Sequence, residues 1–404
     1  MRLLRRPHEA PYERATVHSN PTRRTSAHGL LCRCRLCIDH GRPFVNDRAS
    51  DPLQPTARRR VHDVSVNLAH GSGGRAMRDL IEDVFVSTFD NPTLAALEDQ
   101  AVFALADLAT RGDRLAFTTD SYVVDPLFFP GGDIGTLAVS GTVNDLAVCG
   151  ATPLYLSCAV VIEEGLAVDI LRRVAASMQR VALEAGVAIV TGDTKVVERG
   201  CADKLFINTA GIGVVRRDVS ISARNARPGD IVIVNGYLGD HGAAILVARQ
   251  QLALEADVES DCCPLNSLIA AMLDACPQIH CLRDATRGGV ATVLNEFAQS
   301  SNVTIRLREA DLPLREQVKG ACEILGLDPL YLANEGKLVA VVPADAAERV
   351  LTAMRAHPAG REAAAIGTVE MGEAGPDALV VMQTVFGGQR IVDMLVGEQL
   401  PRIC

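Results

Sequence analysis

The chain lacks an uninterrupted run of about 18 apolar residues, the length that a membrane-spanning helix needs. Its longest apolar stretch, residues 137–162, is broken by Asn144, Asp145 and several glycines. The apolar core of a signal peptide is also lacking, so we expect a cytoplasmic protein with no membrane contact. Hydrophobic residues make up 48% of the chain and charged residues 22%, which is typical of a soluble globular protein.

The composition of a disulfide scaffold is missing as well, because the 12 cysteines are spread over 404 residues. We therefore expect reduced thiols. One crowded group contains five possible zinc ligands: Cys32, Cys34, Cys37, His28 and His40. Zinc ribbons use two separated ligand pairs, which this group does not provide. The segment around it lacks periodic apolar spacing, so we expect residues 1–63 to be a basic, disordered extension.

An overall excess of positive charge is absent, since the net charge is -9. Residues 1–60 hold 13 Arg and 5 acidic residues, for a charge of +8. Residues 61–404 hold 27 basic and 44 acidic residues, for a charge of -17. Because phosphate contacts need a basic face, this balance argues against nucleic acid as a general partner.

The rest of the chain alternates between helix and strand patterns, which predicts two α/β lobes. The predicted helices cover 77–85, 171–181, 242–250, 290–297 and 345–356. The predicted strands cover 115–119, 153–162, 187–191, 205–215, 231–234, 337–342 and 378–384. A turn cluster at 226–230 places the lobe boundary near residue 220, giving lobes at 64–220 and 221–397. The order of elements is mixed, so an α+β description fits as well as a doubly wound one.

A glycine-rich segment, His70 to Gly74, opens the first predicted helix. Glycines allow close backbone approach to an anion, and a helix N-terminus offers unpaired N–H groups. The segment matches neither the P-loop nor the GxGxxG pattern, so on its own it is weak support for phosphate binding.

Five aspartates are predicted at strand ends or loop starts: Asp99, Asp120, Asp145, Asp193 and Asp284. Each follows or interrupts an apolar stretch, where a carboxylate is costly unless it is paired or bound to a metal. Any one of them could be a simple helix cap or turn residue. Five in such contexts favour an oxygen-rich Mg²⁺ site shared with nucleotide phosphates.

Two further charged residues are candidates for chemistry. Lys195 is one of only four lysines, and we predict it directly after a buried strand, where it suits a phosphate or a developing negative charge. A solvated loop lysine is the plainer alternative. Glu335 stands between apolar stretches and could accept a proton.

The chain ends in Cys404, after a short polar stretch that follows the last predicted strand. A terminal thiol on a mobile tether is suited to moving a bound group between sites, so we expect residues 398–404 to be a flexible tail. Considered alone, a terminal cysteine is usually incidental. It is not a prenylation box, which needs three residues after the cysteine.

Several of these segments together resemble the HypE family of hydrogenase maturation proteins. They are 68–74, the turn at 119–121, 141–151, 192–195, 284–289, 334–336 and the ending Pro-Arg-Ile-Cys at 401–404. The resemblance covers residues 64–404. The Asn-Asp-Leu-Ala run within 141–151 is similar to the wider superfamily of aminoimidazole ribonucleotide synthase and selenophosphate synthetase.

The resemblance implies a PurM-like fold of two α/β lobes, with N-terminal lobes paired in a homodimer and ATP bound between the lobes. It also implies a reaction. HypE proteins receive a carbamoyl group on the terminal cysteine from the carbamoyltransferase HypF, and use ATP to dehydrate it to a thiocyanate. The cyano group then passes to iron on the HypC–HypD scaffold, on the way to nickel–iron hydrogenase.

Site residues follow from the same resemblance, joined to the carboxylate argument. Cys404 would be the carrier, Lys195 would stabilise the activated oxygen, and Glu335 would take the proton. Mg²⁺ would be held by Asp99, Asp120, Asp145 and Asp284. ATP would be bound by His70, Gly71, Ser72, Gly73, Gly74, Thr119, Asn144, Gly192 and Asp193.

Two alternatives stay open from the sequence. One is a small-molecule synthetase of the same superfamily, such as a selenophosphate synthetase or a phosphoribosyl-amidine cyclase. Selenophosphate synthetases place a reactive cysteine in the glycine-rich loop, and residues 70–74 contain none. The other is a non-enzymatic scaffold that presents its tail to partner proteins.

Overall fold

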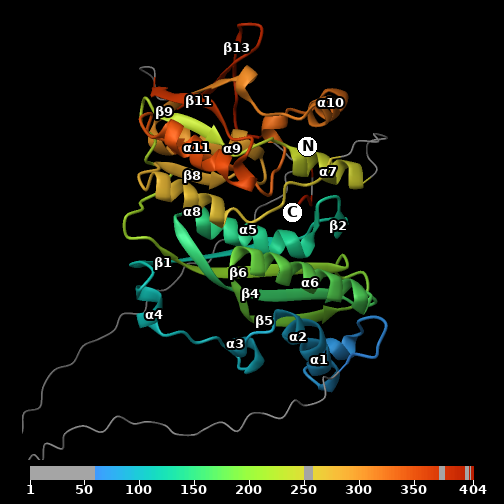
Figure 1. Cartoon of the computed structure of the whole chain (residues 1–404). Coiled ribbons are helices and arrows are strands. Elements are labelled where there is room, and N and C mark those ends of the chain that lie inside the picture. The colour runs from blue at the N-terminus through green and yellow to red at the C-terminus, as the bar shows by residue number, and fades with distance from the viewer. Residues whose placement is uncertain (1–59, 250–257, 373–377, 396–399, 401) are drawn as a thin grey trace, which may run out of the picture. The chain divides into compact units, whose positions relative to one another are not determined.

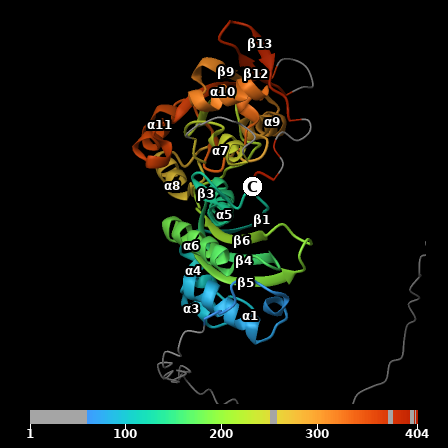
Figure 2. The same cartoon turned by 90° about the vertical axis from the view of Figure 1, so that its right-hand side faces the viewer.

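The computed structural model describes residues 60–249, 258–372, 378–395, 400 and 402–404 (Figure 1). The five possible zinc ligands, and the expected extension up to residue 59, lie outside this part of the chain. The described residues form two lobes, each built on its own sheet, and Figure 2 shows them from the side. No helix among these residues is long and apolar enough to cross a bilayer.

The first lobe is built on a four-stranded sheet with strand order β1-β6-β4-β5. Its strands are β1 (Arg114–Tyr122), β4 (Ala151–Glu163), β5 (Ala188–Val197) and β6 (Leu205–Val215). Strands β4 and β5 pair in parallel, and the other neighbours are antiparallel. The four strands predicted in this lobe are confirmed, although β5 continues past its predicted end.

Two helices, α5 (Ile134–Val148) and α6 (Val168–Ala185), cover one face of this sheet. The apolar spacing of α6 predicted it at 171–181. No helix was predicted over α5, because its residues were interpreted only as part of the broken apolar stretch at 137–162. Nearly every residue of α5 is buried. A helix enclosed on all sides has no polar face, so it carries no 3.6-residue alternation to detect.

The other face of the sheet, which we call the outer face, is covered only in part. A segment with two short helices, α3 (Pro92–Ala95) and α4 (Leu105–Ala109), runs beside it. On this segment Phe103 stacks on Tyr155 of β4, with ring centroids 3.8 Å apart. Large apolar side chains are exposed on the face and on the segment: Leu97, Val102, Leu105, Leu115, Phe117 and Val161.

The predicted helix at 77–85 is present as three consecutive pieces. They are α1 (Arg75–Leu80), a π-helical stretch (Ile81–Val86) and α2 (Ser87–Phe89). Its apolar side packs into the core of the first lobe through Leu80 and Val84. The glycine-rich segment therefore lies where it was expected, at the start of a helix.

The second lobe is built on a seven-stranded sheet of order β13-β12-β9-β11-β7-β10-β8. Its strands are β7 (Ile231–Val234), β8 (Cys281–Asp284), β9 (Val303–Arg308), β10 (Leu338–Val342), β11 (Ala364–Met371), β12 (Val380–Gln383) and β13 (Gln389–Ile391). Its helices are α7 (Asp240–Ala248), α8 (Asn266–Ala275), α9 (Gly289–Ser301), α10 (Glu316–Leu325) and α11 (Ala347–Ala356). Helix α9 packs on one face of the sheet, and α8 and α11 on the other.

The lobes meet along α5, whose C-terminal residues pack into the same core as α8. A short hairpin of the first lobe, β2 (Phe128–Phe129) and β3 (Gly132–Asp133), also reaches the second. Within it, the carbonyl of Pro130 accepts a hydrogen bond from the Ser260 amide at 2.8 Å. The boundary predicted near residue 220 falls between β6 and β7.

Candidate functional site

The last residues of the chain lie in a seat between the two lobes, and both views show the C-terminus there (Figures 1 and 2). The amide of Val123 donates to the Cys404 carbonyl at 3.0 Å, and the amide of Asp125 donates to the Arg402 carbonyl at 3.3 Å. Arg402 Nε donates back to the Val123 carbonyl at 3.1 Å. Ile403 is buried in the core of the first lobe. Of the tail that was expected to be flexible, residues 398–404, the described residues 402–404 are thus seen in a docked arrangement.

The thiol of Cys404 is held among charged groups, and the residue is only 8% exposed. The Arg287 guanidinium lies within hydrogen-bonding reach of the sulfur. Burial raises the pKa of the Cys404 thiol, the nearby Glu335 and Asp120 carboxylates add to the rise, and Arg287 opposes it. The docked thiol is therefore protonated at neutral pH and is a poor nucleophile in this seat.

Glu335 is 3% exposed, and its Oε1 has no hydrogen-bond partner among the described residues. Burial raises its pKa well above the usual range, and the carboxylates of Asp261 and Asp284 raise it further. A buried carboxyl group with a raised pKa and a free oxygen is suited to exchanging a proton with a bound group.

Asp261 fixes the backbone at Glu335. Its Oδ1 accepts the Glu335 amide at 3.0 Å, and its Oδ2 pairs with Lys337 Nζ at 3.0 Å. Burial works against the Asp261 charge, but Lys337 holds its pKa below the usual value. Because the side chains of Lys337 and Asp261 are only 11% and 3% exposed, removal of either would leave an uncompensated charge.

Three of the predicted metal ligands, Asp120, Asp145 and Asp284, converge near this seat. Burial raises the pKa of Asp284 to about 7, and Asp145 and then Asp120 contribute to the rise. Asp145 Oδ2 accepts from the Thr118 hydroxyl at 3.0 Å, and burial raises the pKa of Asp145 as well. Asp145 and Asp284 line a cavity of 410 Å³.

The predicted positions of two of these aspartates were wrong. Asp120 lies within β1 and Asp145 within α5, so neither is at a strand end or a loop start. They come together because α5 packs against β1. Among the residues that the structure describes, no three His, Cys, Asp or Glu side chains are grouped as metal ligands. Mg²⁺ commonly takes only one or two carboxylates and completes its shell with phosphates and water, so this donor set fits it.

Asn144, predicted to bind ATP, ties the two lobes together. Its amide nitrogen donates to the Cys263 carbonyl at 3.2 Å, and its oxygen accepts the Leu265 amide at 2.7 Å. Thr119, also predicted for ATP, points to the outer face, where its hydroxyl donates to the Thr209 carbonyl at 3.2 Å. Their roles toward ATP remain predictions.

Lys195 and Asp193 lie at the opposite edge of the sheet, on β5. Lys195 Nζ pairs with Asp193 at 2.6 Å, and both side chains are more than half exposed. The hydrogen bond from Lys195 holds the pKa of Asp193 below its usual value. The predictions of Asp193 at a strand end or loop start and of Lys195 after the end of the strand were wrong, since β5 runs through both residues to Val197.

The glycine-rich loop lies against this same strand. His70 is buried, and its Nδ1 accepts the Asn67 amide at 3.0 Å, so its ring closes a local turn. Gly71 packs against Val196, where a Cβ would come within 2.8 Å of the valine Cβ. Gly73 has φ of +77° and open space around it, as a loop that approaches an anion requires. Ser72 donates its hydroxyl to the Ala69 carbonyl at 2.9 Å.

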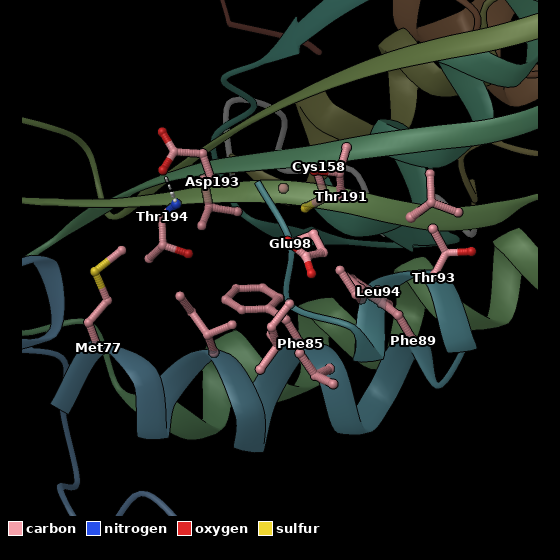
Figure 3. Close-up of a pocket in the computed structure, with 16 residues that line it drawn as sticks. Met77, Phe85, Phe89, Thr93, Leu94, Glu98, Cys158, Thr191, Asp193 and Thr194 are labelled. Atoms are coloured by element: carbon pink, nitrogen blue, oxygen red, sulfur yellow. Dashed lines mark hydrogen bonds between the residues drawn. The ribbon is translucent and has the colours of Figure 1, made fainter. Parts of the chain in front are cut away.

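A cavity of 220 Å³ separates the α1–α2 helix from β4 and β5 (Figure 3). Met77, Phe85 and Phe89 line it from the helix, and Asp193 and the backbone of Gly192 line it from β5. Figure 3 shows the apolar side chains pointing toward the strands. Gly192 itself has a packing role, because a Cβ there would lie 2.2 Å from the Cys158 carbonyl.

The fourth predicted metal ligand, Asp99, is apart from the other three. It is exposed, in the segment after α3, and α3 packs on β5. In all, the predicted residues form two groups on opposite edges of one sheet. Asp120, Asp145, Asp284, Glu335 and Cys404 form the β1-edge group; Asp99, the loop 70–74, Gly192, Asp193 and Lys195 form the β5-edge group. Three strand spacings separate β1 from β5, roughly 14 Å.

Sequence reasoning missed three residues that surround the β1-edge group: Asp261, Arg287 and Lys337. Arg287 lies inside the segment 284–289, of which only Asp284 was assigned a role. Lys337 carried the signal of a rare lysine, and it follows Glu335 by two positions. Asp261 has no signal, because its partners are more than 70 positions away.

Comparison with known proteins agrees with this arrangement. Residues 97–215 match the family model of the AIR synthase related protein N-terminal domain, and residues 227–375 match that of its C-terminal domain. The chain is 58% identical to carbamoyl dehydratase HypE of Rhodobacter capsulatus, over 85% of this chain and 99% of that protein. It is 52% identical to the Escherichia coli K12 protein of the same name, over 84% of this chain and 99% of that protein.

Solved structures give the same result. A crystal structure of the hydrogenase maturation protein HypE in complex with ATP matches with a TM-score of 0.79 and 54% identity, over 83% of this chain and 99% of that one. A HypE–HypF complex matches with a TM-score of 0.67 and 46% identity, over 80% and 100%. Thiamine monophosphate kinase from Aquifex aeolicus shares the two-lobed fold, with a TM-score of 0.52. It is 20% identical, and the match covers 70% of this chain and 89% of that one. At this level of identity to carbamoyl dehydratases over the length of both lobes, the chain belongs to the HypE family of hydrogenase maturation proteins, which confirms the family and the PurM-like fold expected from its motifs.

Proposed function

We propose that this protein uses ATP to dehydrate a carbamoyl group on the Cys404 thiol to a thiocyanate. The observation that carries the proposal is the seat of the tail, which places the terminal thiol beside the buried Glu335 carboxyl group. The relatives named carbamoyl dehydratase support it.

The reaction needs an activated oxygen, because amide oxygen is a poor leaving group. ATP would transfer its γ-phosphoryl group to the carbamoyl oxygen. Loss of phosphate from carbon and removal of the remaining N–H proton then leave the nitrile, with the bond from sulfur to carbon intact. The balance is S-carbamoyl cysteine plus ATP giving S-cyano cysteine, ADP, phosphate and one proton. Phosphoryl transfer of this kind depends mainly on positioning and charge neutralisation.

We assign the proton transfer to Glu335, whose free Oε1 and raised pKa suit an acceptor near the carbamoyl nitrogen. Arg287, beside the sulfur, would hold the carbamoyl oxygen as negative charge develops there. Lys195 is assigned to the activated oxygen or to the phosphate, as its motif suggests.

ATP is proposed as the cosubstrate and Mg²⁺ as its counterion. Asp120, Asp145 and Asp284 supply carboxylate oxygens, the donor type that Mg²⁺ prefers. When bound, the ion would neutralise charge on the phosphates during transfer. Asp284, with a pKa of about 7, is poised to bind a cation on losing its proton.

We infer that the working unit is a homodimer, with each ATP site shared between two copies. Within one chain the β1-edge and β5-edge groups are too far apart to act on one γ-phosphoryl group. The outer face between them exposes large apolar side chains, among them Phe117 at 72% exposure. Such a surface marks an interaction site. A two-fold pairing of outer faces would bring the β5 edge of one copy to the β1 edge of the other.

HypF is the proposed source of the carbamoyl group, since a relative has been solved as a HypE–HypF complex. The HypC–HypD scaffold, carrying the iron, is the proposed acceptor of the cyano group, and the cytoplasm the proposed compartment. Because the docked tail buries Cys404, the tail has to leave its seat for both exchanges.

Intact mass of the full chain tests the proposal after incubation with carbamoyl phosphate, HypF and ATP. We expect a carbamoyl adduct that converts to a cyano adduct, and neither adduct with Cys404→Ala. An unmodified tail with ATP still hydrolysed would contradict the proposal and favour a small-molecule reaction.

A further inference from the structure

A buried histidine lies at the base of the tail's seat. His241 is the second residue of α7, fully buried, and its ring meets Phe129 of the first lobe edge-on with centroids 5.4 Å apart. No step assigned above uses this imidazole. Its two ring nitrogens nevertheless connect the tail to the loop that holds Glu335.

The hydrogen bonds of His241 fix its tautomer. Nε2 lies 2.7 Å from the Ile403 carbonyl, which can only accept, so Nε2 carries a proton. Nδ1 lies 2.8 Å from the Ser260 hydroxyl. Burial lowers the pKa of His241, so the ring is neutral and its Nδ1 accepts from that hydroxyl.

The Ser260 hydroxyl is itself fixed in this direction. Its oxygen accepts the Cys262 amide at 3.1 Å, which leaves its single proton for Nδ1. The Ser260 amide donates to Pro130 of the first lobe at 2.8 Å. The next residue, Asp261, accepts the Glu335 amide. One short loop therefore orients both the histidine that holds the tail and the carboxyl group that faces its thiol.

We propose that His241, held as its Nε2–H tautomer by Ser260, is the positioning residue that seats Cys404 for the reaction. This rests on the function proposed above. The bonded carbonyl belongs to Ile403, directly before the cysteine. The bond therefore fixes the position of the backbone from which the Cys404 thiol extends into the site. Arg249, which follows the other end of the same helix, also supports the seat, since its guanidinium donates to the Arg402 carbonyl at 2.6 Å and to the Asp125 carbonyl at 2.8 Å.

The structural alternative is that His241 only fills the core. The two roles differ in what a substitution does to the tail. Without the Nε2 donor, a docked tail would bury the Ile403 carbonyl unpaired, which shifts the docking equilibrium toward release by roughly tenfold to a hundredfold. A pure packing role predicts lower stability of the whole protein with no selective release of the tail.

The test is the rate at which iodoacetamide alkylates Cys404 in the full-length protein, measured by peptide mass spectrometry. Cys201 is exposed and serves as an internal reference for the reagent. We expect His241→Ala to raise the Cys404 rate at least tenfold while the Cys201 rate stays the same. No carbamoyl group or ATP is needed, so failure of this result is distinguishable from failure of the proposed reaction.

A matched pair of variants separates the hydrogen bond from packing. In His241→Gln the amide nitrogen reaches the place of Nε2 and can donate to Ile403, whereas in His241→Asn the amide reaches only the place of Nδ1. We expect His241→Gln to keep Cys404 protected and His241→Asn to expose it. In single-turnover cyanation of a pre-carbamoylated tail, the same order should hold. Equal alkylation in the two variants, whether both low or both high, would overturn the proposal.

Discussion

The two groups of candidate residues, at the β1 edge and the β5 edge of the first lobe's sheet, differ in how far their side chains are buried. At the β1 edge Glu335 and Cys404 are buried and their pKa values are raised, and the tail that carries Cys404 is hydrogen-bonded to both lobes. At the β5 edge Lys195 and Asp193 are exposed and form an ion pair with each other, beside an open glycine loop. One chain thus completes the environment of its own thiol but leaves its lysine facing outward. This contrast is the reason why we propose that a second copy completes the site.

The largest effect is expected at the buried edge. Glu335→Gln keeps the shape of the protonated side chain but removes the proton acceptor, so cyanation should fall by roughly a thousandfold. Thermal stability should change little, because glutamine has nearly the same shape and the Glu335 Oε1 makes no hydrogen bond to the described residues that the substitution would remove. Single-turnover mass spectrometry on a carbamoylated tail measures the rate, and a variant that still cyanates at the wild-type rate would remove Glu335 from the mechanism.

In the proposed dimer, the β5-edge group can act only if the second copy packs on the outer face. Phe117→Glu places a charge where we expect the second copy to pack, so the dimer should dissociate at micromolar concentration and ATP-dependent cyanation should fall at least tenfold. Leu183→Glu on α6 is the matched control, because Leu183 is equally exposed but lies on the helical side of the sheet. Sedimentation of both variants checks this; a Phe117→Glu dimer as stable as the control would place the interface elsewhere.

A smaller effect is expected in the pH profile. Glu335 accepts a proton only when ionised, so cyanation should rise with pH through its raised pKa. Arg287 lowers that pKa. Arg287→Met should therefore move the acidic limb to higher pH by roughly one unit, whereas Arg287→Lys should leave it nearly in place. The rates are taken on pre-carbamoylated protein, in which Cys404 does not titrate; identical limbs in the three proteins would argue against contact between Arg287 and Glu335.

The smallest change concerns the glycine loop. Gly73→Ala forces a left-handed backbone on a residue with a Cβ, at a cost of about 1 kcal/mol. There is space for the methyl group, so the fold should persist and ATP affinity should fall about fivefold. Calorimetry measures it, with Gly200→Ala as control, since that glycine also has positive φ and open space but lies in the turn between β5 and β6. Equal ATP affinity of the Gly73→Ala and Gly200→Ala variants would argue against contact between the glycine loop and the nucleotide.

Much of the fold was predictable because its exposed elements carry periodic patterns. Helix α6 has one apolar and one polar face, and β6 has buried ends and alternates along most of its length. Helix α5 has no polar face because the sheet, α6 and the second lobe enclose it. Because this helix was not predicted, Asp145 was expected at a strand end or loop start, whereas it lies within α5.

Sequence analysis could predict only those site residues that lie in short sequence motifs. Burial and proximity are tertiary properties, so the partnership of Glu335 with Asp261, or of His241 with the tail, has no local signal. The tail was predicted as a free tether because its seven residues, of which only Leu400 and Ile403 are large and apolar, carry no periodic packing pattern. Its seat comes from Val123 and Asp125, which the sequence separates from it by more than 270 residues.

The central claim is that Cys404 is processed at a site made from both edges, contributed by two copies. Subunit complementation tests it most directly: Lys195→Met and Glu335→Gln chains, each inactive alone, are mixed, dissociated and reassociated, and cyanation is followed by mass. A shared site leaves one intact centre in each mixed dimer, so we predict recovery of roughly a quarter of the wild-type activity. No recovery, with mixed dimers demonstrably formed, would show that one chain holds the complete site.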